Sequence, residues 1–349
     1  KKDKQSPQWK LGEMKFHSMR GYPQLGGNYL QLQVKMFSTR GLNAWDSSQG
    51  LFHQRLNVED PDKIWFEQWL VGVTDGDGSF SIIRQPKGGD KFNLVFKIGQ
   101  SPYNLRILYY IKKQLKAGSV YVEGDNGHYR IRDRKIINQV IFPIFDKYPL
   151  LTTKYLNYIK FKEAYQILEN KELSKQDKTT RLEALIEKKP SSDYVSPAWG
   201  EGRDELNIFE VKKIISKPWL VGFTEAEGSF FIVQKEVGRL VHSFGITQKL
   251  DKIVLESIRQ ILHISAKVQY RVTNKNSYYK LETTNNRAIQ NIVDYFAGTM
   301  KGMKAVEYKI WARALKNKGV LTKITKARDI IRKLRTVRAS TQIFEPYKD

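Results

Sequence analysis

The sequence contains no cysteine among its 349 residues. This excludes disulfide scaffolds, thiol nucleophiles and zinc sites with cysteine ligands. Histidine is also scarce, and the five histidines are too far apart along the chain to suggest a local metal cluster: His17, His53, His128, His242 and His263. No apolar run reaches about 18 residues, so the sequence predicts no membrane-spanning segment and no membrane partner.

Acidic residues are few for a chain of this size, with 36 Asp and Glu against 60 Lys and Arg and a net charge of +24. Because 40% of the residues are hydrophobic, the chain can form real cores and is not a disordered basic tail. The charge favours nucleic acid or an anionic membrane surface as the partner. The cations are spread over strand-like and helix-like segments instead of one amphipathic helix, which favours nucleic acid.

Residues 1–60 differ in composition from the rest of the chain. Up to Trp45 the charged residues are almost all cations, the acids being Asp3 and Glu13, and hydrophobic periodicity is weak. We therefore predict a basic N-terminal extension that is partly disordered. Because the chain begins with Lys1 instead of methionine, we expect that an upstream segment was removed or that the reading frame continues from another coding segment.

The remainder contains an internal repeat. The segment WLVGVTDGDGSF at 69–80 returns as WLVGFTEAEGSF at 219–230, and FKIGQ at 96–100 matches FGITQ at 244–248. A third set follows at the same spacing, in which Lys154, Tyr158 and Phe161 return as Lys304, Tyr308 and Trp311. Three landmarks in one order predict a duplicated domain, with domain 1 at 61–190, a Pro/Ser/Gly-rich linker at 191–213 and domain 2 at 214–349.

Each copy shows the same order of elements, α-β-β-α-β-β-α. A first helix ends at the glycine after the second acid, a common helix stop. Period-2 alternation predicts strands over 91–98 and 267–272, and further helices are expected over about 103–115, 134–147, 151–170, 251–262, 286–296 and 303–316. The fold class is therefore α+β, with two tandem αββαββα domains built on antiparallel sheets.

One face of each sheet is expected to lie under helices, and the other to carry polar side chains, because successive residues point to opposite faces. For a single strand an ordinary solvated face explains this pattern equally well. Repeated over several strands of a basic chain, it favours nucleic-acid contacts. The candidate DNA-binding residues are Lys91, Lys97, Arg130, Arg132, Lys267, Gln269, Arg271, Tyr278 and Lys280.

Two carboxylates stand two residues apart at the end of each first helix, as Asp75 and Asp77 and as Glu225 and Glu227. The C-terminal end of a helix carries partial negative charge and disfavours acids. An EF-hand calcium loop is excluded, because its sixth position requires glycine and is Phe80 here. Simple turn chemistry would explain one copy, whereas two copies indicate a divalent metal held by oxygen ligands.

Gly72 and Gly222 occupy the same place in these two helices. A glycine inside a helix costs about 1 kcal/mol relative to alanine, so we expect a compensating close approach of the two backbones. The helix ends would then meet, and Asp77 and Glu227 would lie together at a pseudo-twofold axis. Two carboxylates beside DNA phosphates require Mg²⁺, and such a site suits phosphodiester hydrolysis.

The segments LVGVTDGDG at 70–78 and LVGFTEAEG at 220–228 resemble the two signature motifs of LAGLIDADG homing endonucleases, in particular the single-chain, double-motif type encoded in organellar group I introns. The resemblance covers about 61–340. It implies a pseudo-twofold saddle of two αββαββα domains over the DNA major groove. It also implies a monomer that makes Mg²⁺-dependent double-strand cuts in a long, asymmetric DNA site.

The resemblance also assigns roles residue by residue. Asp77 and Glu227 are the metal ligands, whereas Asp75 and Glu225 are structural. The other catalytic positions are those where the family has a polar or a basic residue near the water network: Gln100, Gln248, Lys154 and Lys304. Lys301 is an alternative to Lys304, which we prefer because its spacing to Tyr308 repeats that of Lys154 to Tyr158.

Three functions follow from these observations. The first is a site-specific DNA endonuclease, and both metal acids are present. The second, which can coexist with it, is an RNA maturase that helps its host intron to splice, using basic segments 1–45 and 323–338. A non-catalytic DNA-binding regulator would be favoured by a missing acid, and none is missing. The family places the protein in the mitochondrion, with the chloroplast as the alternative.

Overall fold

The computed structural model describes residues 59–85, 91–191, 193–200, 207–273 and 276–339. The described residues belong to one unit, 57–349. The predicted N-terminal extension therefore lies outside the described residues, apart from Glu59 and Asp60. Among the helices that the model describes, none is long and apolar enough to cross a membrane.

The first half begins with helix α1 (Pro61–Asp77), which starts where the Asp60 carboxylate accepts a hydrogen bond from Asp62 N and Pro61 fills the first helical position. The elements that follow are β1 (Gly78–Arg84), β2 (Phe92–Gln100), the 3₁₀ turn η1 (Pro102–Asn104), α2 (Leu105–Leu115), β3 (Ser119–Glu123), β4 (Asn126–Ile131), α3 (Arg134–Ile136), the π turn η2 (Ile137–Ile141), α4 (Phe142–Lys147), α5 (Lys154–Glu169) and α6 (Lys175–Glu187).

The second half repeats this order. Its elements are α8 (Lys217–Glu227), β5 (Gly228–Glu236), β6 (Arg239–Gln248), α9 (Lys252–Ile261), β7 (Gln269–Val272), β8 (Ser277–Thr283), α10 (Asn286–Phe296), α11 (Lys304–Leu315) and α12 (Leu321–Ala339). The predicted α+β fold with two αββαββα repeats is confirmed. Helices α6 and α12, which each follow one repeat, were not predicted.

Each half forms one four-stranded antiparallel sheet, in the orders β1-β2-β4-β3 and β5-β6-β8-β7. One face of each sheet packs on helices through a cluster of aromatic rings. In the first half Phe80 of β1 contacts Phe145 and Phe161, and in the second Phe230 of β5 contacts Phe296 and Trp311. The opposite face of each sheet is therefore left for polar side chains.

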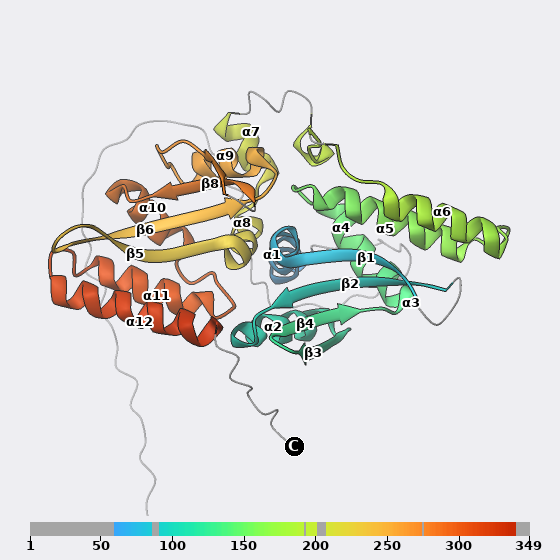
Figure 1. Cartoon of the computed structure of the whole chain (residues 1–349), viewed down its shortest axis with the longest axis horizontal. Coiled ribbons are helices and arrows are strands. Elements are labelled where there is room, and N and C mark those ends of the chain that lie inside the picture. The colour runs from blue at the N-terminus through green and yellow to red at the C-terminus, as the bar shows by residue number, and fades with distance from the viewer. Residues whose placement is uncertain (1–58, 86–90, 192, 201–206, 274–275, 340–349) are drawn as a thin grey trace, which may run out of the picture. The chain divides into compact units, whose positions relative to one another are not determined.

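Helices α1 and α8 pack against each other between the two sheets (Figure 1). A Cβ atom added at Gly72 would lie 2.0 Å from the carbonyl oxygen of Trp219, and one added at Gly222 would lie 2.1 Å from that of Trp69. Neither position has room for a side chain. The close helix contact predicted from the two glycines is therefore present, and it brings the two acidic motifs together.

Gly78 and Gly228 end α1 and α8 as predicted, but the reason for glycine there is not its freedom to adopt a left-handed backbone. Gly78 and Gly228 have extended backbones, with φ of −86° and −75°, which any residue adopts. A Cβ atom at either position would instead lie within 2.5 Å of a methyl group, that of Thr74 or of Thr224. Glycine is needed there because the strand turns back closely over the last helical turn.

The segment predicted as a linker is more ordered than its composition indicates. It contains a 3₁₀ turn, η3 (Pro197–Trp199), and helix α7 (Ile208–Ile214). Trp199 and Val211 are buried, and the indole of Trp199 donates to the carbonyl oxygen of Leu151 at 2.8 Å. Part of the 191–213 connection is thus anchored in the core by apolar side chains that a Pro/Ser/Gly count does not register.

Candidate active site

Asp77 and Glu227 lie at the C-terminal ends of α1 and α8, where the two helices abut. A Cβ atom at Gly76 would be 2.2 Å from Cβ of Ala226 and 3.3 Å from Cγ of Glu227. Burial raises the pKa of Glu227, and the negative charge of Asp77 raises it further. The predicted meeting of the two acids is therefore present, and their mutual repulsion is a property of the folded chain.

The first acid of each motif is fully buried and ties the two halves together. Asp75 accepts hydrogen bonds from Leu151 N and Thr152 N, at 3.0 Å each, and from the indole of Trp219 in the other half at 2.8 Å. Glu225 accepts from Lys301 N at 2.9 Å and, reciprocally, from the indole of Trp69 at 2.8 Å. Both acids thus have the structural surroundings that the resemblance implies.

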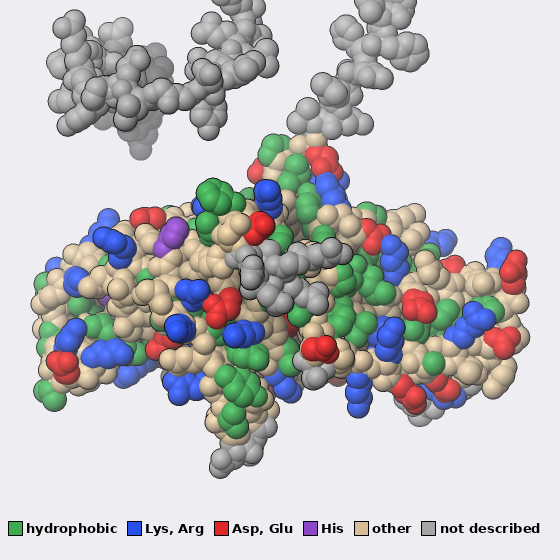
Figure 2. Space-filling model, turned by 90° about the horizontal axis from the view of Figure 1, so that it is seen from above, with side chains coloured by type: hydrophobic (Ala, Val, Ile, Leu, Met, Phe, Trp, Pro, Cys, Tyr) green, Lys and Arg blue, Asp and Glu red, His purple; other side chains and the backbone are tan. Residues whose placement is uncertain are grey.

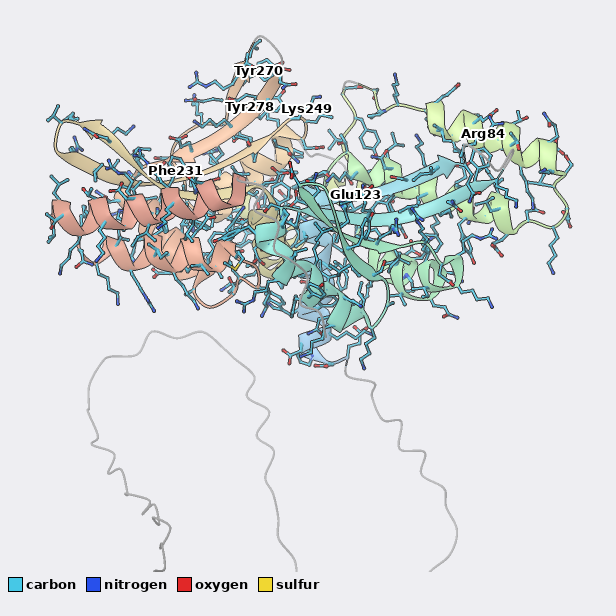
Figure 3. All side chains as sticks on the ribbon, turned by 60° about the horizontal axis from the view of Figure 1, so that its bottom comes forward. Arg84, Glu123, Phe231, Lys249, Tyr270 and Tyr278 are labelled. Carbon is cyan, nitrogen blue, oxygen red and sulfur yellow. The ribbon has the colours of Figure 1, made fainter. Side chains whose placement is uncertain are left out.

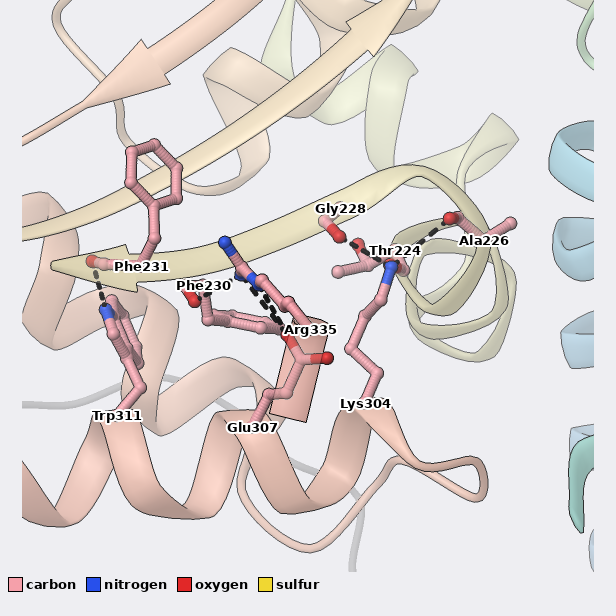
Figure 4. A network of polar contacts seen from close by, with 9 residues as sticks. All are labelled: Thr224, Ala226, Gly228, Phe230, Phe231, Lys304, Glu307, Trp311 and Arg335. Atoms are coloured by element: carbon pink, nitrogen blue, oxygen red, sulfur yellow. Dashed lines mark hydrogen bonds and ion pairs between the residues drawn. The ribbon is translucent and has the colours of Figure 1, made fainter. Parts of the chain in front are cut away.

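The loops held by these acids lead into the helices that carry the two candidate lysines. Lys304 Nζ donates to the carbonyl oxygens of Thr224 and Ala226, at 3.2 Å each, and to that of Gly228 (Figure 4). Lys154 makes the matching contacts with the carbonyls of Thr74 and Gly76. Each lysine thus places a positive charge at the negative end of a motif helix, beside the carboxylates.

Lys301 points elsewhere, since its ammonium lies 4.5 Å from the ring centroid of Trp65. The geometry therefore favours Lys304 as the counterpart of Lys154. Burial lowers the pKa of Lys154, and the charges of Asp75, Asp77 and Glu227 oppose that shift. Lys154 is therefore close enough to the carboxylate pair for their charges to act on it.

The two glutamines differ from each other. Gln100 is buried at the end of β2 and donates through Nε2 to Oδ2 of Asp77 at 2.5 Å. Gln248 is half-buried at the end of β6, and within the part of the chain that the structure describes its side chain makes no hydrogen bond. The repeat predicts the positions of both residues, but it does not predict this asymmetry.

The strand registers place the predicted DNA-binding residues on the sheet faces that point away from the helices. Lys97 lies opposite Arg130, Gln269 opposite Lys280, and Arg271 opposite Tyr278. The remaining candidates lie just beyond strand ends: Lys91, Arg132 and Lys267. Figure 4 shows the same division on β5, where Phe230 points toward α11 and Phe231 points away from it.

These faces are not uniformly basic. Figure 3 shows Glu123 on β3 and Tyr278 on β8, and Lys280 forms an ion pair with Glu282. The side of the molecule seen from above in Figure 2 likewise mixes Lys and Arg with acidic side chains. Among the described residues no group of three or more His, Asp and Glu side chains is arranged to hold a metal ion.

Two further residues of the site were not predicted from the sequence. Asn104 and Asp251 stand immediately before α2 and α9, but neither side chain caps its own helix. Each accepts a hydrogen bond from the other half of the protein, from Met303 N at 2.8 Å and from Thr153 N at 2.9 Å respectively. A polar residue before a helix reads as an N-cap, so the sequence holds no signal for these contacts.

Comparison with known proteins agrees with this geometry. A model of the LAGLIDADG endonuclease family matches residues 70–165 and again 220–315. A probable intron-encoded endonuclease, Cox1-I1b of Schizosaccharomyces pombe, is 41% identical over 283 residues, which cover 79% of this chain and 70% of that protein. The uncharacterized mitochondrial protein RF1 of Saccharomyces cerevisiae is 34% identical over 193 residues, 52% of this chain and 35% of that protein.

Among solved structures, the meganuclease I-SmaMI bound to uncleavable DNA superposes with a TM-score of 0.60 at 25% identity, covering 78% of this chain and 97% of that one. Another structure of I-SmaMI is bound to cleaved DNA, and one holds an uncleaved target in the presence of calcium ions. Both halves match the family model, and both motif acids occupy equivalent places. The chain belongs to the LAGLIDADG endonuclease family, and the prediction of a double-motif DNA endonuclease is confirmed.

Proposed function

We propose that the chain cuts both strands of a long, asymmetric DNA site, with Mg²⁺ held by Asp77 and Glu227. The observation that supports this most directly is the pair of carboxylates at the abutting ends of α1 and α8, between two sheets with polar faces. We further propose that the protein acts as a monomer, because one chain supplies both motifs. Domain limits of 61–190 and 214–349 remain part of this proposal.

The residues present fit a divalent metal. Two carboxylates provide the hard oxygen ligands that Mg²⁺ prefers. In the chain alone, burial raises the pKa of Glu227, and the charge of Asp77 raises it further. When bound, Mg²⁺ would supply an activated water and neutralise charge on the leaving oxygen. The chain holds one ligand in place through Gln100, whereas Lys154 and Lys304 offset negative charge at the two helix ends.

The two sheets support an asymmetric target. Ser79 of β1 and Ser229 of β5 are equivalent in the repeat, and the residues beside them across each sheet differ in charge. Ser79 pairs with Lys97, which pairs with Arg130. Ser229 pairs with Gly245, which pairs with Glu282. One half thus offers two cations where the other offers none, so the two halves would read different base pairs and phosphates.

The test uses intronless host DNA or a randomised duplex library with Mg²⁺. We expect double-strand cutting by the wild-type chain, and loss of cutting with retained binding in Asp77→Asn and Glu227→Gln. Binding should weaken with rising salt, because the sheet cations displace counterions from phosphates. Full cleavage by both acid variants would contradict the proposed metal site. Gly99→Ala, whose added methyl group would make only ordinary contacts, serves as a control for folding.

We also propose a mitochondrial location, supported by the fungal relatives and by the mitochondrial protein RF1 among them. An experiment that follows the tagged chain in fractionated cells tests this. Recovery with chloroplasts would favour the alternative, and recovery with neither organelle would contradict both.

Host-intron RNA is a second candidate partner, favoured by the charge of the helix pair α11–α12. Within 304–336 the acids are Glu307, which is buried and paired with Arg335, and Asp329. The exposed cations are Lys309, Arg313, Lys316, Lys318, Lys323, Lys326, Arg332 and Lys333. The equivalent pair α5–α6 instead mixes acids with its cations. The excess of cations is therefore specific to the second half.

Lys316→Glu/Lys323→Glu should weaken binding of intron RNA and leave DNA cleavage unchanged, because Lys316 directly follows α11 and Lys323 lies on α12, both outside the sheet faces. The charge-matched control is Arg181→Glu/Lys188→Glu, which changes one residue on α6 and the residue that directly follows it. Equal loss of RNA binding in both double variants would show a general charge effect and refute a specific surface on α11–α12.

A further inference from the structure

Asn104 and Asp251 occupy equivalent places in the two halves, and neither side chain accepts a hydrogen bond from the helix that follows it. A residue before a helix ordinarily accepts a hydrogen bond from the first turn, which is worth about 1 kcal/mol. Neither side chain does so here. Each instead reaches across to the residue that precedes a site lysine, Asn104 to Met303 and Asp251 to Thr153. Each half therefore braces the lysine loop of the other.

In the first half this brace continues to the metal-ligand candidate. Met303 N donates to Oδ1 of Asn104 at 2.8 Å, Nδ2 of Asn104 donates to Oε1 of Gln100 at 2.8 Å, and Nε2 of Gln100 donates to Oδ2 of Asp77. A backbone N–H can only donate, so it fixes which end of the Asn104 amide faces it. The orientation of Gln100 follows, and its N–H is turned toward the carboxylate.

In the second half the chain of hydrogen bonds stops at Asp251. Its two oxygens accept from Thr153 N and Thr153 Oγ1, at 2.9 and 3.3 Å. Among the described residues, neither oxygen of Asp251 is hydrogen-bonded to the side chain of Gln248. If Gln248 donated to Asp251 instead, its own oxygen would face Glu227. The connection is also one residue shorter, and Asp251 adopts a left-handed backbone with φ of 56°.

We propose that Asn104 is a positioning residue that orients Gln100 toward Asp77, and that its replacement by Asp251 in the second half makes the two cleavage sites unequal. The strand that depends on the Asp77 site is then cut first. This inference rests on the proposed endonuclease function. It attributes the order in which the two DNA strands are cut to a residue that contacts neither DNA nor metal.

The surroundings of Asn104 are shaped for this role. Its side chain is buried, and a Cβ atom added at Gly302 would lie 2.7 Å from its Oδ1. The equivalent of Gly302 in the first half is Thr152, whose hydroxyl bonds to Asp75 instead. Glycine at 302 therefore leaves the space that the Asn104 amide occupies, whereas the loop that Asp251 contacts carries a threonine side chain at the equivalent position.

The test follows the two strands separately. The wild-type chain first selects a cleavage site from a randomised duplex library, and this duplex is then made with a different fluorophore on each strand. Single-turnover rates are measured with Mg²⁺ at saturating protein. Asn104→Asp keeps the acceptor for Met303 N and removes the donor to Gln100. We expect this variant to slow the first-cut strand about tenfold and the second-cut strand less than about twofold.

The matched control is Asn285→Asp, the same change at an N-cap that does bond to its own helix, at Arg287 N and Ala288 N. It should change neither rate. A variant that is merely less stable loses amplitude on both strands, so the ratio of the two rates separates positioning from folding. Equal slowing of both strands, slowing of the second-cut strand alone, or no slowing would each overturn the proposal.

A double-mutant cycle tests the route through Gln100. If Asn104 acts only by orienting that residue, Asn104→Ala/Gln100→Ala should cut the first strand no more slowly than Gln100→Ala alone. Additive slowing would contradict the proposed route. A wild-type chain that cuts no DNA would instead refute the endonuclease proposal, so failures of the two proposals are distinguishable.

Discussion

Asp251→Asn offers a quantitative test of the electrostatics beside the active site. Burial raises the pKa of Asp251 from its ordinary value of 3.8 to about 7, against the hydrogen bonds from Thr153. The charge of Asp75 also raises this pKa, and that of Lys154 lowers it. Burial raises the pKa of Tyr194, and the charges of Tyr155 and Asp251 raise it further. Asparagine keeps an oxygen for the Thr153 N–H but does not ionise, so it removes this titration while the contact remains.

The sign follows from proton binding. Between pH 3.8 and about 7 the folded chain keeps a proton on Asp251 that the unfolded chain has released, so stability falls as pH rises through this window. A difference of about 3 in pKa corresponds to about 4 kcal/mol, most of it between pH 4 and 7. Over the practical range from about pH 5 to 8 the loss for the wild-type chain is about 3 kcal/mol.

The measurement is urea unfolding of both proteins at about pH 5 and pH 8. The stability of Asp251→Asn relative to the wild-type chain should rise by about 3 kcal/mol between these conditions. Asp125→Asn, which alters an exposed carboxylate in a turn, is the control and should show a constant difference. A constant difference for Asp251→Asn as well would refute the placement of a neutral carboxyl group at this position near pH 5.

Three other predictions concern the helix interface and the lysines. Gly222→Ala should lower the free energy of unfolding in urea by about 1–3 kcal/mol or more, because the added Cβ would clash with the Trp69 carbonyl oxygen. The control Gly99→Ala should leave it unchanged, because the nearest atom to its added Cβ is in His128, at 3.6 Å. Asp75→Asn should cost about 3 kcal/mol or more in the same assay, since one oxygen loses two donated hydrogen bonds, and a change below about 1 kcal/mol would contradict the tie between the halves. Lys304→Met should abolish DNA cleavage with binding retained, whereas Lys301→Met should cut at the wild-type rate, and the reverse result would exchange their roles.

The repeat explains why so much of the fold could be predicted. Because the pattern occurs twice, each element in one copy can be checked against its counterpart in the other. Helix α10 was predicted over its observed range, and the buried and polar faces of the strands were predicted correctly. The elements without a matching counterpart in the other copy were not predicted. Helices α6 and α12 follow the repeats with dissimilar sequences, and the anchoring of Trp199 depends on a core built by distant residues.

The site divides in the same way. Carboxylates, glutamines and lysines at matching positions could be selected by comparison of the copies, and the structure brings Asp77, Gln100 and Glu227 to one region. The spacing to Tyr308 already favoured Lys304 over Lys301, and the contacts of Lys304 with the α8 carbonyls agree with that preference. Asn104 could not be found because its partner, Met303, is 199 residues away in the sequence. Comparison of the copies also hides differences, and the unequal surroundings of the two glutamines are such a difference.

The exchange of indole and acid between α1 and α8 restricts how halves of such proteins can be recombined. Trp69 meets Glu225, but Trp219 meets the shorter Asp75. A homodimer made from two first halves would offer Trp69 an aspartate, one methylene short of the carboxylate it meets now. A hybrid with a half from a relative would face the same mismatch unless tryptophan and acid were transferred as a matched pair. The two tryptophan–acid pairs therefore limit which halves are compatible, and halves for engineered hybrids should first be compared at these four positions.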